Sequence, residues 1–213
     1  SQGFPVVAYD LNTYGYYGTY VVSRDIAGTT DRLSVLNGNG SQQYYYDVSQ
    51  SFGDIVFFPW YYTEGTSPDF YHTVYFGTSE GYLFRLIDTG SALNLGIGWP
   101  LKVCEEITSA VVPDGTNIYF GGINKGIPRI YGVEITTRTA PLSATVTSPV
   151  RATPSWDKNT GGTTYLFTGS DSPTPILYRV NVTARVIDVQ NTTPLDSVRA
   201  PTIYWPWTQG IYV

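Results

Sequence analysis

The 213-residue sequence contains few of the residue types that most catalytic and metal sites use. It has one histidine, His72, one cysteine, Cys104, and no methionine. A structural zinc site needs about four Cys or His ligands, and no Gly-x-Ser-x-Gly turn accompanies the histidine. We therefore predict no catalytic and no metal-binding residues. Cys104 cannot form a disulfide within the chain, so it is either a small buried residue or a thiol that pairs with another chain.

Charged residues are also scarce, at 14% of the sequence, and the formal net charge is -5. No cluster of Lys and Arg is present that could displace the counterions of nucleic-acid phosphates or hold an anionic membrane surface. No run of about 18 apolar residues could span a bilayer. We therefore predict that the chain neither binds nucleic acid nor inserts into a membrane.

The residues that are abundant favour strands and tight turns over helices. The chain has 22 Gly, 14 Pro and 19 Tyr, with many Ser, Thr and Asn. Tyr, Thr and Asn in place of charges are typical of proteins outside the cell, so we predict an extracellular or cell-surface location. Because the sequence does not begin with Met, we expect a processed secreted chain or a piece of a longer one.

Three short patterns recur along the chain at intervals of 42 to 50 residues. One, typified by Val-Tyr-Phe-Gly-Thr, is found at residues 74–78, 118–122 and 165–169. A second, typified by Leu-Phe-Arg-Leu, follows it at residues 33–36, 83–86, 130–133 and 177–180. A third precedes the first, at residues 109–114, 151–156 and 199–204. With a looser fourth strand in each unit, four strands per repeat of this length indicate propeller blades.

We therefore predict an all-β fold, a β-propeller of four-stranded antiparallel blades, with a β-sandwich as the alternative. About 4.5 blades fit in the chain. Residues 1–213 would form a single propeller domain or fragment, with blades at about 5–48, 54–103, 106–146 and 149–190 and the start of a fifth at 198–213. The glycine at the end of the second strand of a blade, as in the patterns at residues 74–78 and 118–122, is expected to allow a tight backbone turn near the propeller axis. Proteins avoid open strand edges, so another polypeptide is expected to complete or cover the fifth blade.

Two segments resemble known propeller repeats. Val74-Tyr-Phe-Gly-Thr-Ser-Glu-Gly-Tyr-Leu-Phe-Arg-Leu-Ile-Asp-Thr-Gly90 resembles the repeat of quinoprotein-like (PQQ-type) propellers. Pro5-Val-Val-Ala-Tyr-Asp-Leu-Asn12 and Leu33-Ser-Val-Leu-Asn-Gly-Asn-Gly-Ser41 resemble FG-GAP repeats. The combination is similar to the C-terminal propeller of type IV pilus tip adhesins, which implies a binding role at a cell surface.

The sequence departs from both repeat families at their ligand positions. FG-GAP blades often bind calcium, but Tyr14 and Gly18 replace two of the expected carboxylates and leave only Asp10 and Asn12. Calcium needs six to eight oxygen ligands. Many quinone-dependent dehydrogenases of this fold carry adjacent cysteines, whereas Glu105 follows the single cysteine of this chain. We therefore predict no cofactor and no bound metal.

Dense aromatic runs at residues 57–62 and 204–207 are longer than strand alternation requires. We expect them where strands give way to Pro-containing loops. Exposed Tyr and Trp side chains anchor protein interfaces and also stack on sugar rings. The predicted interface residues are Trp60, Tyr61, Tyr62, Tyr204, Trp205 and Trp207.

The function predicted from these features is that of a non-catalytic extracellular binding or scaffold propeller for protein–protein or surface assembly, as in pilus- or filament-associated adhesins. One alternative is a propeller enzyme, either a quinone-linked dehydrogenase or a glycoside hydrolase with two carboxylates at a central tunnel. The carboxylate candidates are Asp10, Asp54, Asp114 and Asp157, although Asp114 and Asp157 lie in turn-forming contexts. The other alternative is a lectin-like carbohydrate binder. The predicted partners are therefore another polypeptide and, for the lectin alternative, a carbohydrate.

Overall fold

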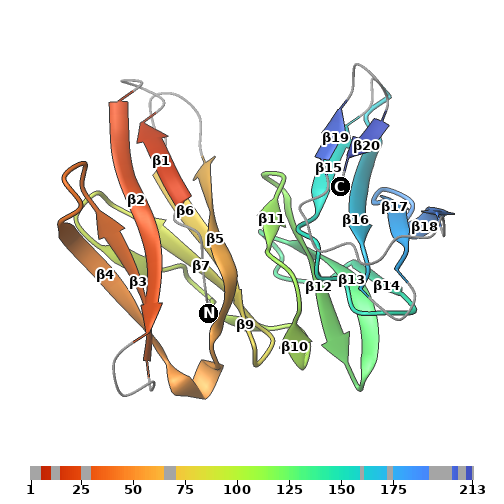
Figure 1. Cartoon of the computed structure of the whole chain (residues 1–213), viewed down its shortest axis with the longest axis horizontal. Helices are drawn as coiled ribbons and strands as arrows, with labels where there is room; N and C mark the ends of the chain where they lie inside the picture. Colours follow the sequence, from red (N-terminus) through yellow and green to blue (C-terminus); the bar gives the residue numbers. More distant parts are fainter. Residues whose placement is uncertain are drawn as a thin grey trace. The chain divides into compact units, whose positions relative to one another are not determined.

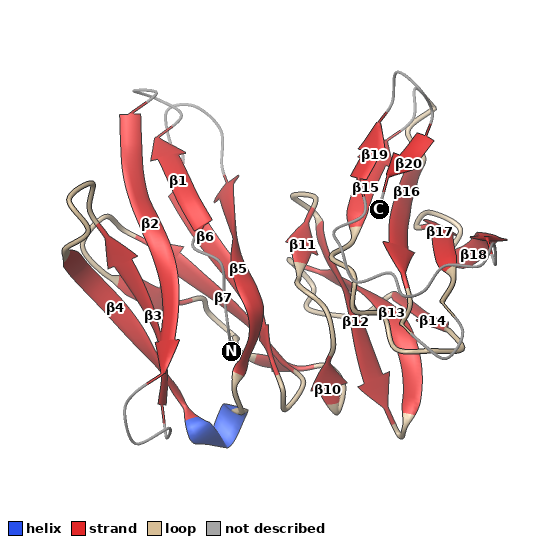
Figure 2. Ribbon diagram, in the orientation of Figure 1, coloured by secondary structure: helices blue, strands red, loops and turns tan. Residues whose placement is uncertain are grey.

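A computed structural model describes residues 6–10, 15–24, 30–64, 71–158, 161–171, 175–191, 203–205 and 210–212 (Figure 1). Strands dominate this part of the chain, and its one helical element is a short 3-10 turn, η1 (Gln50–Phe52) (Figure 2). None of its helices has the length and apolar character needed to cross a membrane. The chain divides into two compact units, Ser1–Val103 and Cys104–Val213.

Unit 1 contains two antiparallel sheets, each with four strand positions in sequence order. The strands of the first sheet, blade 1, are β1 (Val6–Asp10), β2 (Gly15–Arg24), β3 (Thr30–Leu36) and β4 (Gln42–Ser49). Those of the second, blade 2, are β5 (Ile55–Glu64), β6 (Tyr71–Thr78), β7 (Tyr82–Asp88), β8 (Leu93–Leu95) and β9 (Leu101–Lys102). The segments β8 and β9 both pair with β7, so together they fill the fourth position.

Unit 2 repeats this arrangement. Blade 3 consists of β10 (Glu106–Ile107), β11 (Val112–Pro113), β12 (Asn117–Asn124), β13 (Ile127–Glu134) and β14 (Leu142–Thr145). Here β10 and β11 share the first position, because both pair with β12. Blade 4 consists of β15 (Ser155–Lys158), β16 (Thr164–Gly169), β17 (Leu177–Asn181) and β18 (Val186–Asn191). A further sheet has two strands among the described residues, β19 (Ile203–Trp205) and β20 (Gly210–Tyr212).

Within each unit, consecutive blades bury apolar side chains against one another. In unit 1, Leu33 and Val35 of β3 belong to the same buried cluster as Phe84 and Leu86 of β7. In unit 2, Tyr119 of β12 belongs to a cluster that includes residues of β16 and β17 in blade 4. Alternate residues of a strand point to opposite faces, so each strand supplies one row to such a cluster. Burying one of these side chains contributes about 1.5–3 kcal/mol.

Gly121 has a different role from the one its sequence position suggested. It lies in the middle of β12, and its φ is not among the positive values that favour glycine in this structure. A Cβ atom there would lie 2.6 Å from both Cβ and the carbonyl oxygen of Val150. The expectation of a tight turn is therefore wrong for Gly121, which instead lets the chain entering blade 4 approach β12 closely.

Candidate binding surface

The most distinctive polar surface of unit 1 lies on the face of blade 1 opposite the apolar cluster. Leu33 and Val35 enter that cluster, so Arg32 lies on the other face of β3. Register places Arg32 between Ser23 of β2 and Asp47 of β4. Ser23, Arg32, Asp47 and Tyr45, which is two residues before Asp47 on β4, are called the Arg32 surface below.

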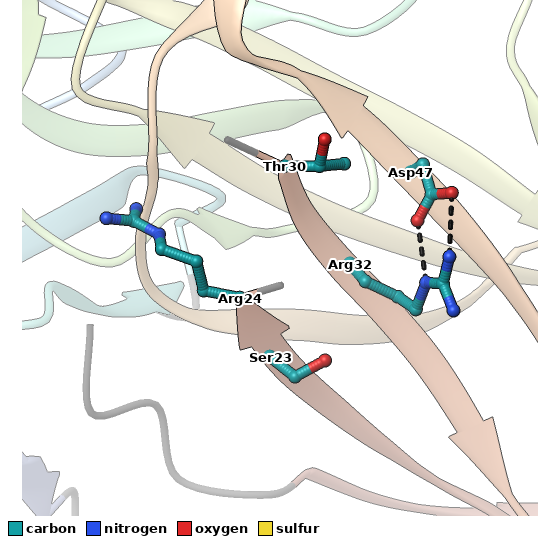
Figure 3. A pocket seen from close by; sticks show the side chains of 5 residues that line it. All are labelled: Ser23, Arg24, Thr30, Arg32 and Asp47. Atoms are coloured by element: carbon teal, nitrogen blue, oxygen red, sulfur yellow. Dashed lines mark hydrogen bonds and ion pairs between the residues drawn. The ribbon is translucent and has the colours of Figure 1, made fainter. Parts of the chain in front are cut away.

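Arg32 and Asp47 form a two-point ion pair across β3 and β4 (Figure 3). The Nε–Oδ1 distance is 2.7 Å and the Nη2–Oδ2 distance is 2.9 Å. The guanidinium carbon also lies 3.7 Å from the centre of the Tyr45 ring, a cation–π contact. Tyr45 is 46% exposed. The surface therefore presents an aromatic ring and a pre-oriented guanidinium, the two groups most enriched at protein-interface hot spots.

A cavity of 230 Å³ adjoins this pair and is lined by Ser23, Arg24, Thr30, Arg32 and Asp47. Figure 3 shows the Arg24 guanidinium pointing away from the Arg32–Asp47 pair. Arg24 instead bonds to Asp31, with Nε 2.7 Å from Oδ1, and to Asp54, with Nη2 2.5 Å from Oδ1. Asp31 and then Asp54 raise the pKa of Arg24 above its ordinary value through these hydrogen bonds. The cavity thus has firmly held charges on its walls and is open to a polar partner.

Buried carboxylates connect blade 1 to blade 2. Asp88, at the end of β7, is 3% exposed and accepts hydrogen bonds from the hydroxyls of Tyr20 at 2.5 Å and Tyr44 at 2.8 Å. Asp31, 4% exposed, accepts the backbone N–H of Ile55 at 2.6 Å in addition to Arg24. Both carboxylates accept hydrogen bonds from the neighbouring blade, so they hold the two blades together.

Unit 2 carries a surface of the same composition on blade 4. Arg179 of β17 forms a two-point pair with Asp188 of β18, with both N–O distances 3.1 Å. The Arg179 guanidinium carbon lies 5.1 Å from the centre of the Tyr165 ring. Both surfaces place an arginine of the third strand between an aspartate of the fourth strand and a tyrosine ring.

Four carboxylates were considered for a glycosidase. Those whose contacts the structure describes form hydrogen bonds or ion pairs with neighbouring protein groups. Asp114 accepts hydrogen bonds from the backbone N–H groups of Thr116 and Asn117 at 2.8 and 2.6 Å, and from the Tyr119 hydroxyl at 2.6 Å. These bonds make it an Asx-type turn residue. Asp54 pairs with Arg24, Asp157 is half-buried on β15, and Asp10 ends β1. Among the described residues, no three His, Cys, Asp or Glu side chains gather where they could hold a metal ion.

The predicted interface aromatics occupy strands. Trp60, Tyr61 and Tyr62 lie within β5, opposite Tyr75, Val74 and Thr73 of β6. Their expected position at a strand-to-loop transition is therefore wrong, because β5 continues through the buried Pro59 to Glu64 with an irregular register between Val56 and Trp60. Tyr204 and Trp205 lie in β19, and Trp207 lies outside the described residues.

The structure places the cysteine in the interior. Cys104 is 4% exposed, and its thiol donates a hydrogen bond to the carbonyl oxygen of Glu106 at 3.1 Å. A Cβ atom on Gly122 would lie only 2.9 Å from the Sγ atom of Cys104. An interchain disulfide would therefore require the start of unit 2 to open first.

Sequence reasoning missed the Arg32 surface. The run Tyr44-Tyr45-Tyr46 is not among the predicted interface residues, yet Tyr45 is exposed and its two neighbours are half-buried against the apolar cluster of unit 1. Strand alternation alone gives one outward residue in that run. The neighbouring Asp47, with an arginine on the preceding strand, was the signal that could have identified the surface.

No protein-family model and no curated protein sequence matches the chain. Among solved structures, a chain of the "Crystal Structure of Mitotic Checkpoint Complex" aligns with a TM-score of 0.57 and 10% identity, covering 89% of this chain and 50% of that one. TolB from Acinetobacter baumannii aligns with a TM-score of 0.44 and 16% identity, covering 88% of this chain and 54% of its own. The Dos1 propeller aligns with a TM-score of 0.32 and 9% identity, covering 93% of this chain and 75% of that one.

This chain thus spans about half the length of the first two of these structures. At such identities the likeness concerns the fold alone. Together with the repeated four-stranded antiparallel sheets and the packing of consecutive sheets within each unit, it confirms the predicted fold class. The chain has a β-propeller fold in which about four blades fit, and β19–β20 is a further sheet with two described strands.

Proposed function

We propose that this propeller is a non-catalytic binding module that engages another polypeptide, and that it works outside the cell. The observation that carries this proposal is the Arg32 surface. Tyr45 is held in place by Arg32, and Arg32 by Asp47, so the ring loses little conformational entropy when a partner covers it. A rigid aromatic ring beside a neutralised guanidinium is suited to a protein partner.

The carboxylates support a binding role over a catalytic one. A glycosidase requires one carboxyl group to donate a proton and a second to act as nucleophile or base. Asp31, Asp88 and Asp114 instead accept two or three short hydrogen bonds each from neighbouring protein groups. Carboxylates held in this way are engaged in structural contacts.

The finer parts of the proposal come from the sequence. The low charge and high Tyr content favour an extracellular or cell-surface location. The resemblance to quinoprotein-like and FG-GAP repeats, and to the propeller of type IV pilus tip adhesins, favours a role in surface assembly. We further propose that a partner segment adds strands to the β19–β20 sheet, since strand addition is a common mode of peptide binding.

Site-specific photo-crosslinking tests the proposal. A benzophenone amino acid would replace Tyr45 in the full-length protein within the cells that make it, and the same substitution at Ile97 would serve as the control. Ile97 is 90% exposed on unit 1 and lies on the loop between β8 and β9, so it is not one of the residues of the Arg32 surface. We expect irradiation to attach a discrete polypeptide at position 45 and not at position 97.

Absence of an adduct at position 45, or the same adducts at both positions, would contradict the proposed interface. The same substitution at Trp60 and Trp205 tests the aromatic residues predicted from sequence. Proteolysis of intact cells tests the location, because an extracellular propeller is cleaved without lysis and an internal one is not.

A further inference from the structure

A second pocket, in unit 2, has the features of a small-molecule site. It has a volume of 290 Å³ and is lined by blade 3 at the ends of β12, β13 and β14, and by blade 4 at the start of β16 and in the β17–β18 turn. Ligand pockets usually measure about 300–1,000 Å³, so this one suits a molecule the size of one sugar ring. Its polar lining residues are Thr116, Asn117, Glu134, Thr164, Thr183 and Arg185. It is called the Arg185 pocket below.

The hydrogen-bonding capacity of this lining is largely unused. Arg24, Arg32 and Arg179 all pair with aspartates, whereas the Arg185 guanidinium makes no ion pair or hydrogen bond with any described residue. The hydroxyls of Thr164 and Thr183 are likewise unpartnered within the described part of the chain. The pocket therefore offers one cation and at least two neutral donor–acceptor groups to a ligand.

Glu134 of blade 3 adds an acceptor to the lining. One of its carboxylate oxygens, Oε2, accepts the Thr137 hydroxyl at 2.8 Å. A negative charge in the same lining as Arg185 disfavours a dianion such as phosphate, because like charges repel. It favours a ligand that also carries hydroxyl donors. Pro141, Leu142 and Val182 provide apolar contacts for the C–H groups of a ring.

We propose that the Arg185 pocket binds a sugar acid, that is, a single sugar ring with a carboxylate. The guanidinium would receive the carboxylate in a two-point, charge-assisted contact. Threonine hydroxyls and the Glu134 carboxylate would receive the ring hydroxyls. None of the described lining residues is aromatic, so recognition by them depends on hydrogen bonds and not on ring stacking. This site is separate from the polypeptide interface proposed on unit 1, and either can fail without the other.

The backbone at Arg185 gives an unusually clean test. Arg185 has φ 60°, and Arg138, at the corresponding turn of blade 3, has φ 57°. This left-handed region favours glycine over residues with a side chain. Arg185→Gly therefore removes the guanidinium while relieving backbone strain, and its thermal midpoint is expected to equal or exceed that of the wild type. Arg138→Gly makes the same backbone change outside the pocket and is the matched control.

The experiment is calorimetric titration of the full chain with sodium D-glucuronate, with D-glucose and inorganic phosphate as comparison ligands. We expect glucuronate to bind with a millimolar or lower Kd, and neither glucose nor phosphate to match it. Arg185→Gly is expected to weaken glucuronate binding at least about tenfold, the loss expected for a charge-assisted contact. Arg138→Gly is expected to bind like the wild type.

Several outcomes would overturn the proposal. One is the absence of glucuronate binding to the wild-type chain at about 20 mM, a concentration above the expected millimolar Kd. Another is equal affinity for glucose, which would show that the carboxylate is not read. Phosphate binding as tight as glucuronate binding would reduce the pocket to a general oxyanion site. Equal loss in Arg138→Gly and Arg185→Gly would place the effect in the turns and not in the guanidinium.

Discussion

Between blades 1 and 2, ionisable groups make the buried polar contacts. Asp88 accepts two tyrosine hydroxyls of blade 1, and Asp31 accepts the backbone N–H of Ile55 while it holds Arg24. Between blades 3 and 4, two described hydrogen bonds run from neutral side chains to backbone carbonyl oxygens. The Thr108 hydroxyl donates a hydrogen bond to the carbonyl oxygen of Val150 at 2.7 Å. The indole N–H of Trp156 donates one to the carbonyl oxygen of Pro113 at 3.1 Å.

The two junctions have similar apolar clusters, so the difference lies in how the backbone is positioned. In unit 1, buried side-chain carboxylates bridge the blades, and each needs its partners because an unpaired buried charge is costly. In unit 2, Gly121 lets the backbone of the next blade come within van der Waals contact. The first junction is therefore sensitive to loss of charge, and the second is sensitive to added volume.

The largest effect is expected for Asp31→Ala. This change leaves the buried N–H of Ile55 without its acceptor and Arg24 without the buried one of its two partners, so we expect a loss of about 3 kcal/mol in the free energy of unfolding. Urea unfolding of the full chain measures it. Asp47→Ala is the control, since Asp47 also pairs with an arginine but its side chain is 41% exposed. We expect the control to lose less than about 1 kcal/mol. Equal losses would show that burial does not distinguish the two pairs.

Gly121→Ala is expected to follow, with a loss of about 2–3 kcal/mol from overpacking against Val150. The comparison variant is Gly126→Ala, where a Cβ meets nothing within 4 Å but φ is +69°. Its cost comes from backbone conformation alone, about 1 kcal/mol. Hydrogen exchange of unit 2 peptides, read with the unfolding curves, measures both. A smaller loss at Gly121 than at Gly126 would mean that β12 and residue 150 separate easily.

The smallest effect is expected for Tyr119→Phe, whose effect on the free energy of unfolding should depend on pH in the alkaline range. Burial, and then the hydrogen bond to Asp114, raise the pKa of Tyr119 above its ordinary value. A tyrosine with a raised pKa stabilises the fold fully below its unfolded-state pKa of about 10 and loses that contribution as pH rises further. We therefore expect Tyr119→Phe to cost about 1 kcal/mol at neutral pH and progressively less above pH 10. Urea midpoints of both proteins across this range measure the difference. A gap between them that is constant with pH would contradict this interpretation.

Strand pattern and repeat spacing were readable from the sequence because each depends on local chemistry. Alternation of apolar and polar residues, turn residues between them, and a recurrence near 47 residues predicted four-stranded antiparallel blades, and the structure confirms them. The sequence did not reveal that the aromatic run at residues 57–62 lies within strand β5. Proline in a strand is usually confined to edges, strand starts and bulges, and Pro59 lies where the pairing of β5 with β6 is irregular, so the strand continues past it.

The two candidate sites differ in how far sequence could reach them. Arg32 and Asp47 meet because the register of β3 and β4 places them opposite each other, and a register shift between Val35 and Leu36 occurs in the same strand pair. The Arg185 pocket collects residues from two blades, separated by up to about 70 positions in the chain. No local sequence pattern predicts that these distant residues line one pocket.

The sequence by itself determined the class of fold, the number of blades it holds and the low charge of the surface, because period, turn chemistry and composition are properties of neighbouring residues. Only the tertiary structure decided which charges are bridged, that Arg185 has no side-chain partner among the described residues, and why a glycine is needed in the middle of β12. Those features depend on distances between blades, and such distances are set by packing between segments that are far apart in the chain.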